Sequence, residues 1–128
     1  MRTFANSLIS VLVLVTFSCA RDPQAFLAEV SGDYEATYGD TKETLEIRKD
    51  KTFVHKVYVS DTLEKVENGA FEVGGNTLRL SPFTMFYNPD KKSRGTPDEW
   101  ASFGLDFYSR SRSLMPRSDD AFGYRRKL

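Results

Sequence analysis

The chain has very few of the residues from which disulfides and metal centres are built. Its 128 residues include one cysteine, Cys19, and one histidine, His55. A single cysteine excludes an internal disulfide, so the folded part must be stabilised by packing. The same two residues cannot supply a zinc site of histidine and cysteine ligands. We therefore expect neither a metal nor another cofactor.

The chain also lacks an excess of charge of either sign, with 18 basic and 18 acidic residues. Nucleic acid is not an expected partner, because binding to phosphates requires a basic surface. The charges are nevertheless uneven, since residues 29–50 are mainly acidic and residues 110–127 mainly basic. Either the terminal strands pair and their charges complement each other, or the basic segment faces a partner.

No apolar run is long enough to span a membrane as a helix, since the longest extends only from Leu8 to Phe17. Arg2 precedes this run, and the small residues Ser18, Cys19 and Ala20 follow it. A charged start, a short apolar core and small residues at a cleavage site are typical of a secretory signal peptide. We predict that residues 1–20 direct export and that residues 21–128 form one mature domain.

Two cleavage sites fit this signal. Cleavage after Ala20 would release a secreted protein. The segment Thr16–Cys19 also resembles in part the lipobox of bacterial lipoproteins. Ser18 and Cys19 fit that pattern, whereas Thr16 stands where an aliphatic residue is usual and Phe17 where a small one is usual. In that case Cys19 becomes the acylated first residue, and the protein is an outer-membrane or periplasmic lipoprotein of the cell envelope.

The mature part alternates between apolar and polar residues with the period of β-strands. Asp22–Glu29 is the exception and reads as a short helix, with Asp22 as its cap and Pro23 in its first turn. The expected strands are 33–38, 44–48, 52–59, 64–73, 77–80, 83–87, 103–113 and, as an edge strand, 122–127. Tight turns join most of them, which predicts an all-β, antiparallel up-and-down meander that curls into a small barrel or half-barrel. A sandwich of two small sheets is the alternative.

Four short segments resemble the lipocalin-like domains of small bacterial lipoproteins. They are Gly32–Tyr34, Lys49–Phe53, Gly69–Phe71 and Asn76–Leu80. Such domains have a glycine near an aromatic in the first strand, a hairpin of the form Asp-Gly-Thr-aromatic, a Gly-x-Trp strand and a short Leu-x-Leu strand. Here Lys51 replaces the hairpin glycine, and Tyr34 and Phe71 replace tryptophans. The resemblance, which spans Ser31 to Leu80, implies an up-and-down barrel whose interior holds an apolar ligand.

The alternation places a row of aromatic side chains on the inner face of this barrel. The candidates for contact with a small apolar ligand are Tyr34, Phe53, His55, Phe71, Phe103 and Phe107. A narrow barrel can instead be filled by its own side chains. His55 is then either a polar group in a ligand cavity or a core histidine with one hydrogen-bond partner.

A second hypothesis is a protein-interaction or inhibitor module that uses the loop Asn88–Trp100. This loop combines Lys91, Lys92 and Arg94 with Trp100. Thr96 and Glu99 have the spacing of a capping box, which predicts a helical turn through Trp100. No Ser-His-Asp motif, Gly-x-Ser-x-Gly motif or phosphate-binding loop is present, so we expect a protein that is not an enzyme. A hydrolase that uses carboxylates alone is the remaining enzymatic alternative.

Overall fold

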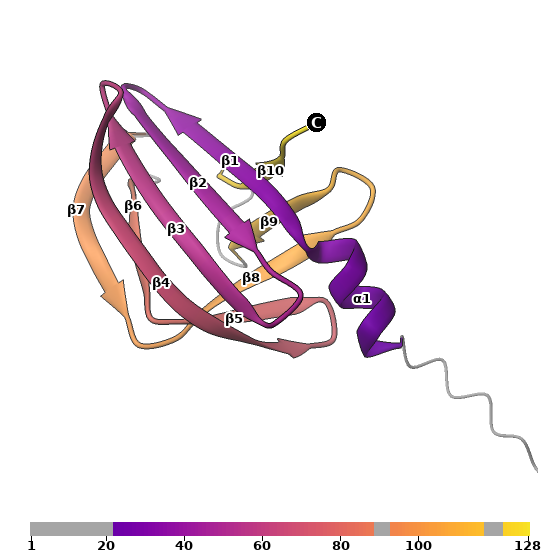
Figure 1. Cartoon of the computed structure of the whole chain (residues 1–128). Coiled ribbons are helices and arrows are strands. Elements are labelled where there is room, and N and C mark those ends of the chain that lie inside the picture. The colour runs from indigo at the N-terminus through magenta and orange to yellow at the C-terminus, as the bar shows by residue number, and fades with distance from the viewer. Residues whose placement is uncertain (1–21, 89–92, 117–121) are drawn as a thin grey trace, which may run out of the picture.

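The structure, a computed structural model, describes residues 22–88, 93–116 and 122–128. One short helix precedes ten strands (Figure 1). The elements are α1 (Pro23–Val30), β1 (Gly32–Tyr38), β2 (Thr41–Ile47), β3 (Thr52–Val59), β4 (Thr62–Gly74), β5 (Thr77–Ser81), β6 (Phe83–Asn88), β7 (Ser93–Trp100), β8 (Phe103–Tyr108), β9 (Ser113–Pro116) and β10 (Tyr124–Arg126).

Eight of the strands form a closed antiparallel barrel. Their order around it is β1, β10, β9, β8, β5, β4, β3 and β2. Strands that are consecutive in the chain therefore lie side by side, except that β5 pairs with β8 because β6 and β7 are not part of the barrel. These two strands leave the barrel and pair only with each other, as a separate β-hairpin (Figure 1). The prediction of an all-β meander that closes into a small barrel with an N-terminal helix is confirmed.

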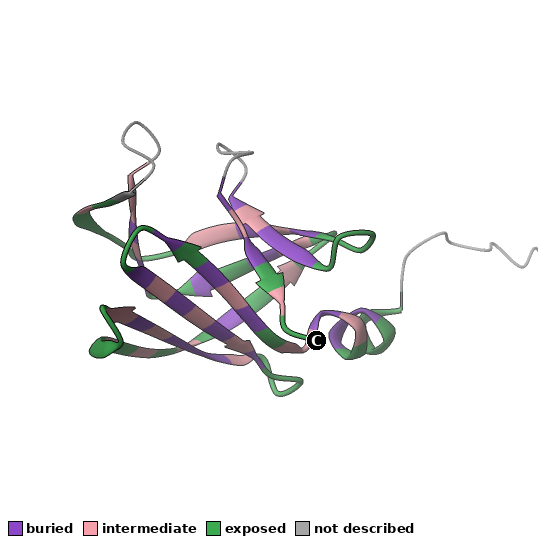
Figure 2. Ribbon diagram, turned by 90° about the horizontal axis from the view of Figure 1, so that it is seen from above, coloured by how far each residue is buried: buried purple, intermediate pink, exposed green. Residues whose placement is uncertain are grey.

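The strands of the barrel alternate between buried inner and more exposed outer side chains (Figure 2), and the pairing of β1 with β10 closes the sheet. In β2, for example, Leu45 and Ile47 are buried, while Glu46 between them is partly exposed. The core is continuous from the helix through the barrel and includes large rings such as Tyr34, Phe53 and Tyr124.

Helix α1 packs against the barrel as its sequence predicts. The Asp22 side chain accepts a hydrogen bond from the Gln24 amide at 3.1 Å, and Pro23 occupies the first turn. The buried face of α1 includes Phe26, whose ring meets Phe107 edge to face at a centroid distance of 5.9 Å. One end of the barrel interior is therefore packed against the helix.

Two glycines allow close approaches that a side chain would prevent. Gly32 has a φ of +151°, and a Cβ atom there would lie 2.7 Å from the Arg126 guanidinium. Arg126 donates hydrogen bonds to the carbonyls of Glu29 and Ser31, which joins the end of α1 to β10. At Gly69 a Cβ atom would lie 2.6 Å from the Phe53 ring, so the absence of a side chain makes room for that ring.

Three of the expected elements are wrong. Residues 93–100 are strand β7 rather than a loop and a helical turn, because pairing with β6 outweighs the local capping-box pattern. The strand through Phe107 ends at Tyr108, and a turn then leads into the separate strand β9. Strand β10 is not an edge strand, because it pairs with β9 on one side and β1 on the other.

Candidate functional site

The β6–β7 hairpin covers an opening beside the first half of β4. Strand β5 pairs only with residues Ala70–Gly74 of β4, so Thr62–Gly69 have a barrel neighbour on the β3 side alone. Side chains of β6 enter this opening. The ring of Phe83, which is fully buried, stacks on His55 at a centroid distance of 4.7 Å and on Phe103 at 5.1 Å.

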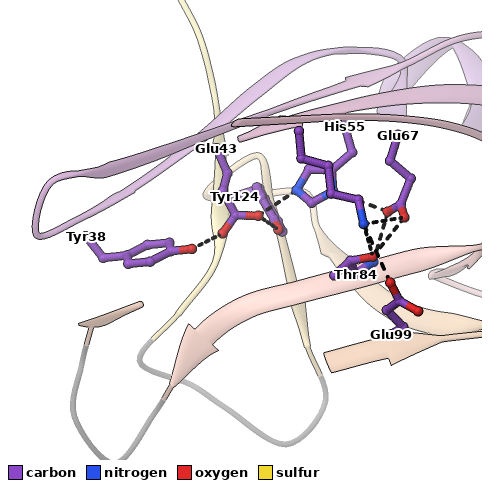
Figure 3. Close-up of polar contacts among 8 residues, drawn as sticks. Tyr38, Glu43, His55, Glu67, Thr84, Glu99 and Tyr124 are labelled. Atoms are coloured by element: carbon purple, nitrogen blue, oxygen red, sulfur yellow. Dashed lines mark hydrogen bonds and ion pairs between the residues drawn. The ribbon is translucent and has the colours of Figure 1, made fainter. Parts of the chain in front are cut away.

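A buried polar cluster lies beneath the hairpin (Figure 3). It consists of Tyr38, Glu43, His55, Glu67, Thr84 and Tyr124. Its centre is the fully buried Glu43 carboxylate, which lies 2.5 Å from the His55 Nε2 atom. The same carboxylate accepts hydrogen bonds from the hydroxyls of Tyr38 at 2.5 Å and Tyr124 at 2.9 Å.

The two carboxylates favour a charged imidazole. Burial of the His55 ring lowers its pKa, but hydrogen bonds to Glu43 and Glu67 outweigh this effect and raise the pKa above its usual value of 6.5. The imidazolium can donate to Glu43 through Nε2 and to Glu67, 3.5 Å away, through Nδ1. Burial and the nearby Glu43 charge raise the pKa of Tyr38 and of Tyr124 well above 10, so both hydroxyls remain donors.

Glu67 connects the polar cluster to the hairpin. Its carboxylate accepts hydrogen bonds from the backbone amide and the hydroxyl of Thr84, each at 2.9 Å. Burial raises the pKa of Glu67, but the hydrogen bonds from His55 and Thr84 have the larger effect. Together they bring the pKa below its usual value of 4.5. Lys65 on the same strand donates to the Thr84 hydroxyl at 3.1 Å and lies 3.9 Å from Glu99 on β7. Side chains, rather than a β-ladder, therefore hold the hairpin on the barrel.

An aromatic cluster of Tyr38, Tyr87 and Phe122 lies at the edge of the covered region. Tyr87 and Phe122 stack at 4.5 Å, and Tyr38 meets each of them edge to face at 5.1 Å and 5.6 Å. The three rings come from β1, β6 and the segment before β10. Strand β10 pairs with β1 only at Tyr34 and Glu35, so Tyr38 lies beyond the paired part of β1.

The aromatic cluster borders an open groove with a volume of about 1100 Å³, where Tyr87 is partly exposed while Tyr38 and Phe122 are buried. The groove follows β10 between the second half of β1 and strand β9. Its walls include Thr37, Ser113 and Met115, and Arg125 and Lys127 also line it. Three further pockets among the described residues are likewise half-open clefts at the surface.

The candidate cavity residues lie where the alternation places them, inside the barrel. Tyr34, Phe53, His55, Phe71 and Phe107 are buried, whereas Phe103 is partly exposed and contacts Trp100. The Tyr34 hydroxyl donates to the Val30 carbonyl at 2.6 Å, and burial raises its pKa to about 12. His55 is a core histidine, but it has two carboxylate partners rather than one.

Only two of the four candidate partner-binding residues belong to the part of the chain that the structure describes. Lys91, Lys92 and the predicted lipidation site Cys19 lie outside the described residues. Arg94 is exposed on β7, and Trp100 is 46% exposed at the end of the same strand. The structure thus places two of the four predicted contact residues on one exposed strand.

Sequence reasoning missed Glu43, Glu67 and the aromatic cluster. The sequence did carry a signal for Glu43, because it stands at alternate positions with Leu45 and Ile47 and so faces the same, inner side of β2. Glu67 is the direct cross-strand partner of His55, so its position follows only once the register of β3 and β4 is known. For Tyr87 and Phe122 no local signal exists, because their contact depends on how the hairpin folds back.

Comparison of the chain with protein-family models, curated proteins and solved structures finds no match. Within the described ranges, no group of three or more histidine, cysteine or acidic side chains is placed to hold a metal ion. The only helix among these residues, α1, is too short to cross a membrane. Every buried polar side-chain atom in the described part of the chain has a hydrogen-bond partner.

Proposed function

We propose that the protein is an exported, non-enzymatic binding module of lipocalin-like form, which binds a small apolar ligand at the groove beside its barrel. The single observation that supports this function best is the aromatic cluster beside an open groove of about 1100 Å³. Ligand sites are typically concave and lined by aromatic side chains with a few polar groups. This groove is concave and has three aromatic rings in its lining, although about half of its lining residues are polar or charged.

The barrel interior supports the groove rather than competing with it. The predicted cavity residues pack against one another and against Phe83, and the polar cluster occupies the space beneath the hairpin. A filled small barrel provides a rigid wall for a site on its outer face. We therefore place the ligand in the groove, with the inner-face aromatics as the structural core behind it.

The lipocalin-like assignment is supported by the backbone at the β2–β3 hairpin. Lys51 stands where the resembled pattern has glycine, and its φ of +66° is a conformation that glycine adopts most easily. The signal-like segment of residues 1–20 supports export, and Cys19 supports an attachment to the cell envelope through a lipid.

Native mass spectrometry of residues 21–128 tests this proposal. This segment contains α1 and all ten strands, and circular dichroism would first confirm that it folds. We expect a co-purifying small molecule of defined mass on the freshly purified protein. The adduct should disappear in Tyr87→Ala and persist in Leu63→Ala, which truncates a side chain that is 48% exposed outside the groove. An adduct-free protein, or equal loss in both variants, would contradict a groove ligand.

A second candidate function is capture of a protein partner by the β6–β7 hairpin. Within the described ranges, β7 pairs only with β6, and the exposed Arg94 and half-exposed Trp100 both lie on it. Exposed aromatic and arginine residues are frequent anchors of protein interfaces. If Arg94→Ala with Trp100→Ala abolishes capture of a partner from an envelope extract and Tyr87→Ala does not, the hairpin is the binding surface.

A further inference from the structure

We propose, on the basis of the function proposed above, that the ligand of the groove is a small amphipathic anion. Its charged group would bind Arg125, and its apolar part would lie against the aromatic cluster. The proposal rests on the Arg125 guanidinium, which has no ion pair among the described residues and lines the same groove as the three rings.

Arg125 is exposed on the outer face of β10 and lines the groove. Its cross-strand neighbours are Glu35 on β1 and Ser113 on β9. Glu35, however, forms its ion pairs with Lys127 at 3.4 Å and Lys42 at 3.8 Å. Across residues 22–88, 93–116 and 122–128, no carboxylate lies within ion-pair distance of Arg125.

The charges around Arg125 favour an anion. The ionisable side chains that line the groove close to it are Glu35, Arg126 and Lys127, so with Arg125 three cations face one carboxylate. Arg126 is already bound to the carbonyls of Glu29 and Ser31. Leu128 also lines the groove, and its carboxylate reduces the surplus there to one positive charge. The guanidinium of Arg125 is thus available to a ligand and has the geometry to hold a carboxylate, phosphate or sulfonate through two hydrogen bonds.

The aromatic cluster lies a short distance along the same segment. Phe122 precedes Arg125 by three residues, which corresponds to roughly 10 Å in extended chain. Gly123 lies between them, and a Cβ atom there would be 2.8 Å from the Met115 side chain, so Met115 packs closely over this glycine. A ligand with a ring or short apolar chain joined to one anionic group spans this distance.

Two fluorescent probes of nearly the same shape test the charge requirement. 8-Anilinonaphthalene-1-sulfonate carries an anionic group, and N-phenyl-1-naphthylamine has the same aromatic body without it. Titration of residues 21–128 at low salt should show the anionic probe binding more tightly by about threefold to fivefold, the size of an exposed ion pair. The preference should shrink at 0.5 M salt, because salt screens exposed charges.

Three variants locate the two ends of the site. Arg125→Gln should abolish the preference for the anionic probe while leaving the affinity for the neutral probe unchanged. Arg110→Gln, which changes an exposed arginine outside the groove, should preserve the preference. Tyr87→Ala should weaken both probes equally, because it removes part of the shared apolar surface.

The outcomes separate the two proposals. If neither probe binds and no small molecule co-purifies, the groove is not a ligand site and the proposed function fails. If both probes bind with equal affinity, or if Arg125→Gln leaves their ratio unchanged, the groove binds apolar ligands and the anion proposal is overturned. If Arg110→Gln also removes the preference for the anionic probe, that preference comes from the net charge of the protein rather than from Arg125. This result would also overturn the proposal.

Discussion

The substitution Glu43→Gln is expected to destabilise the protein more than any other change of a single acidic residue on β2. The Glu43 carboxylate accepts hydrogen bonds from two tyrosine hydroxyls and lies against the His55 ring, with no exposure to solvent. Glutamine has almost the same shape, so the variant leaves no cavity. It replaces one acceptor oxygen by an NH2 group, which would face a donor, and it removes the negative charge beside the imidazolium.

Removal of one partner of a buried ion pair costs about 3–5 kcal/mol, because the other charge remains buried without compensation. A domain of this size has a free energy of unfolding of about 5–15 kcal/mol, so the loss would be a large part of the total. With a urea dependence of about 1–3 kcal/mol per molar, the midpoint should fall by about 2 M.

Urea unfolding followed by circular dichroism measures this loss. The matched control is Glu46→Gln, three residues along the same strand, because Glu46 points outward and pairs with the exposed Arg48 at 3.0 Å. That variant should unfold at nearly the same urea concentration as the original protein. Equal midpoints for the two variants would refute the conclusion that the buried cluster stabilises the barrel through Glu43.

Three further predictions concern pH, packing and export. The raised pKa of His55 implies a stabilising contribution that is complete below about pH 6.5 and is lost as the pH rises through the folded value. The lowered pKa of Glu67 implies a second stabilising contribution, which is complete above about pH 4.5 and is lost as the pH falls. The midpoint of urea unfolding should therefore be highest between about pH 4.5 and pH 6.5. A midpoint that rises steadily towards pH 9 would contradict this prediction. Gly69→Ala should lower stability by about 1–3 kcal/mol in thermal unfolding, because the new methyl group meets a phenylalanine ring and a backbone carbonyl, whereas Gly74→Ala meets open space. Cys19→Ser should move the protein from the membrane to the soluble fraction of the cell, and unchanged fractionation would rule out a lipid anchor at this residue.

Much of the barrel could be predicted because the apolar period of a strand is a local property. The alternation around Tyr34, Leu45 and Phe53 specifies which side chains face inward, whatever the neighbouring strand is. The cap of α1 is equally local, since Asp22 and Pro23 act within one turn. Residues 93–100 were predicted wrongly for the same reason: the capping-box pattern is local, but pairing with β6 decided their conformation.

The candidate site was only partly predictable, because its members come from different strands. The position of His55 on the inner face follows from alternation, but its bonds to Glu43 and Glu67 depend on the registers of β2, β3 and β4. The groove depends on the short pairing between β1 and β10, which leaves the second half of β1 without a neighbour on that side.

The sequence by itself therefore determined the class of fold, the inward set of aromatic side chains and the short helix at Asp22, because these follow from interactions between residues a few positions apart. Only the tertiary structure decided that the β6–β7 hairpin leaves the barrel, that a histidine lies between two buried carboxylates and that Arg125 has no carboxylate partner among the described residues. These features arise from contacts between residues far apart in the chain. Their formation depends on which strands pair, in which register, and on the burial that follows.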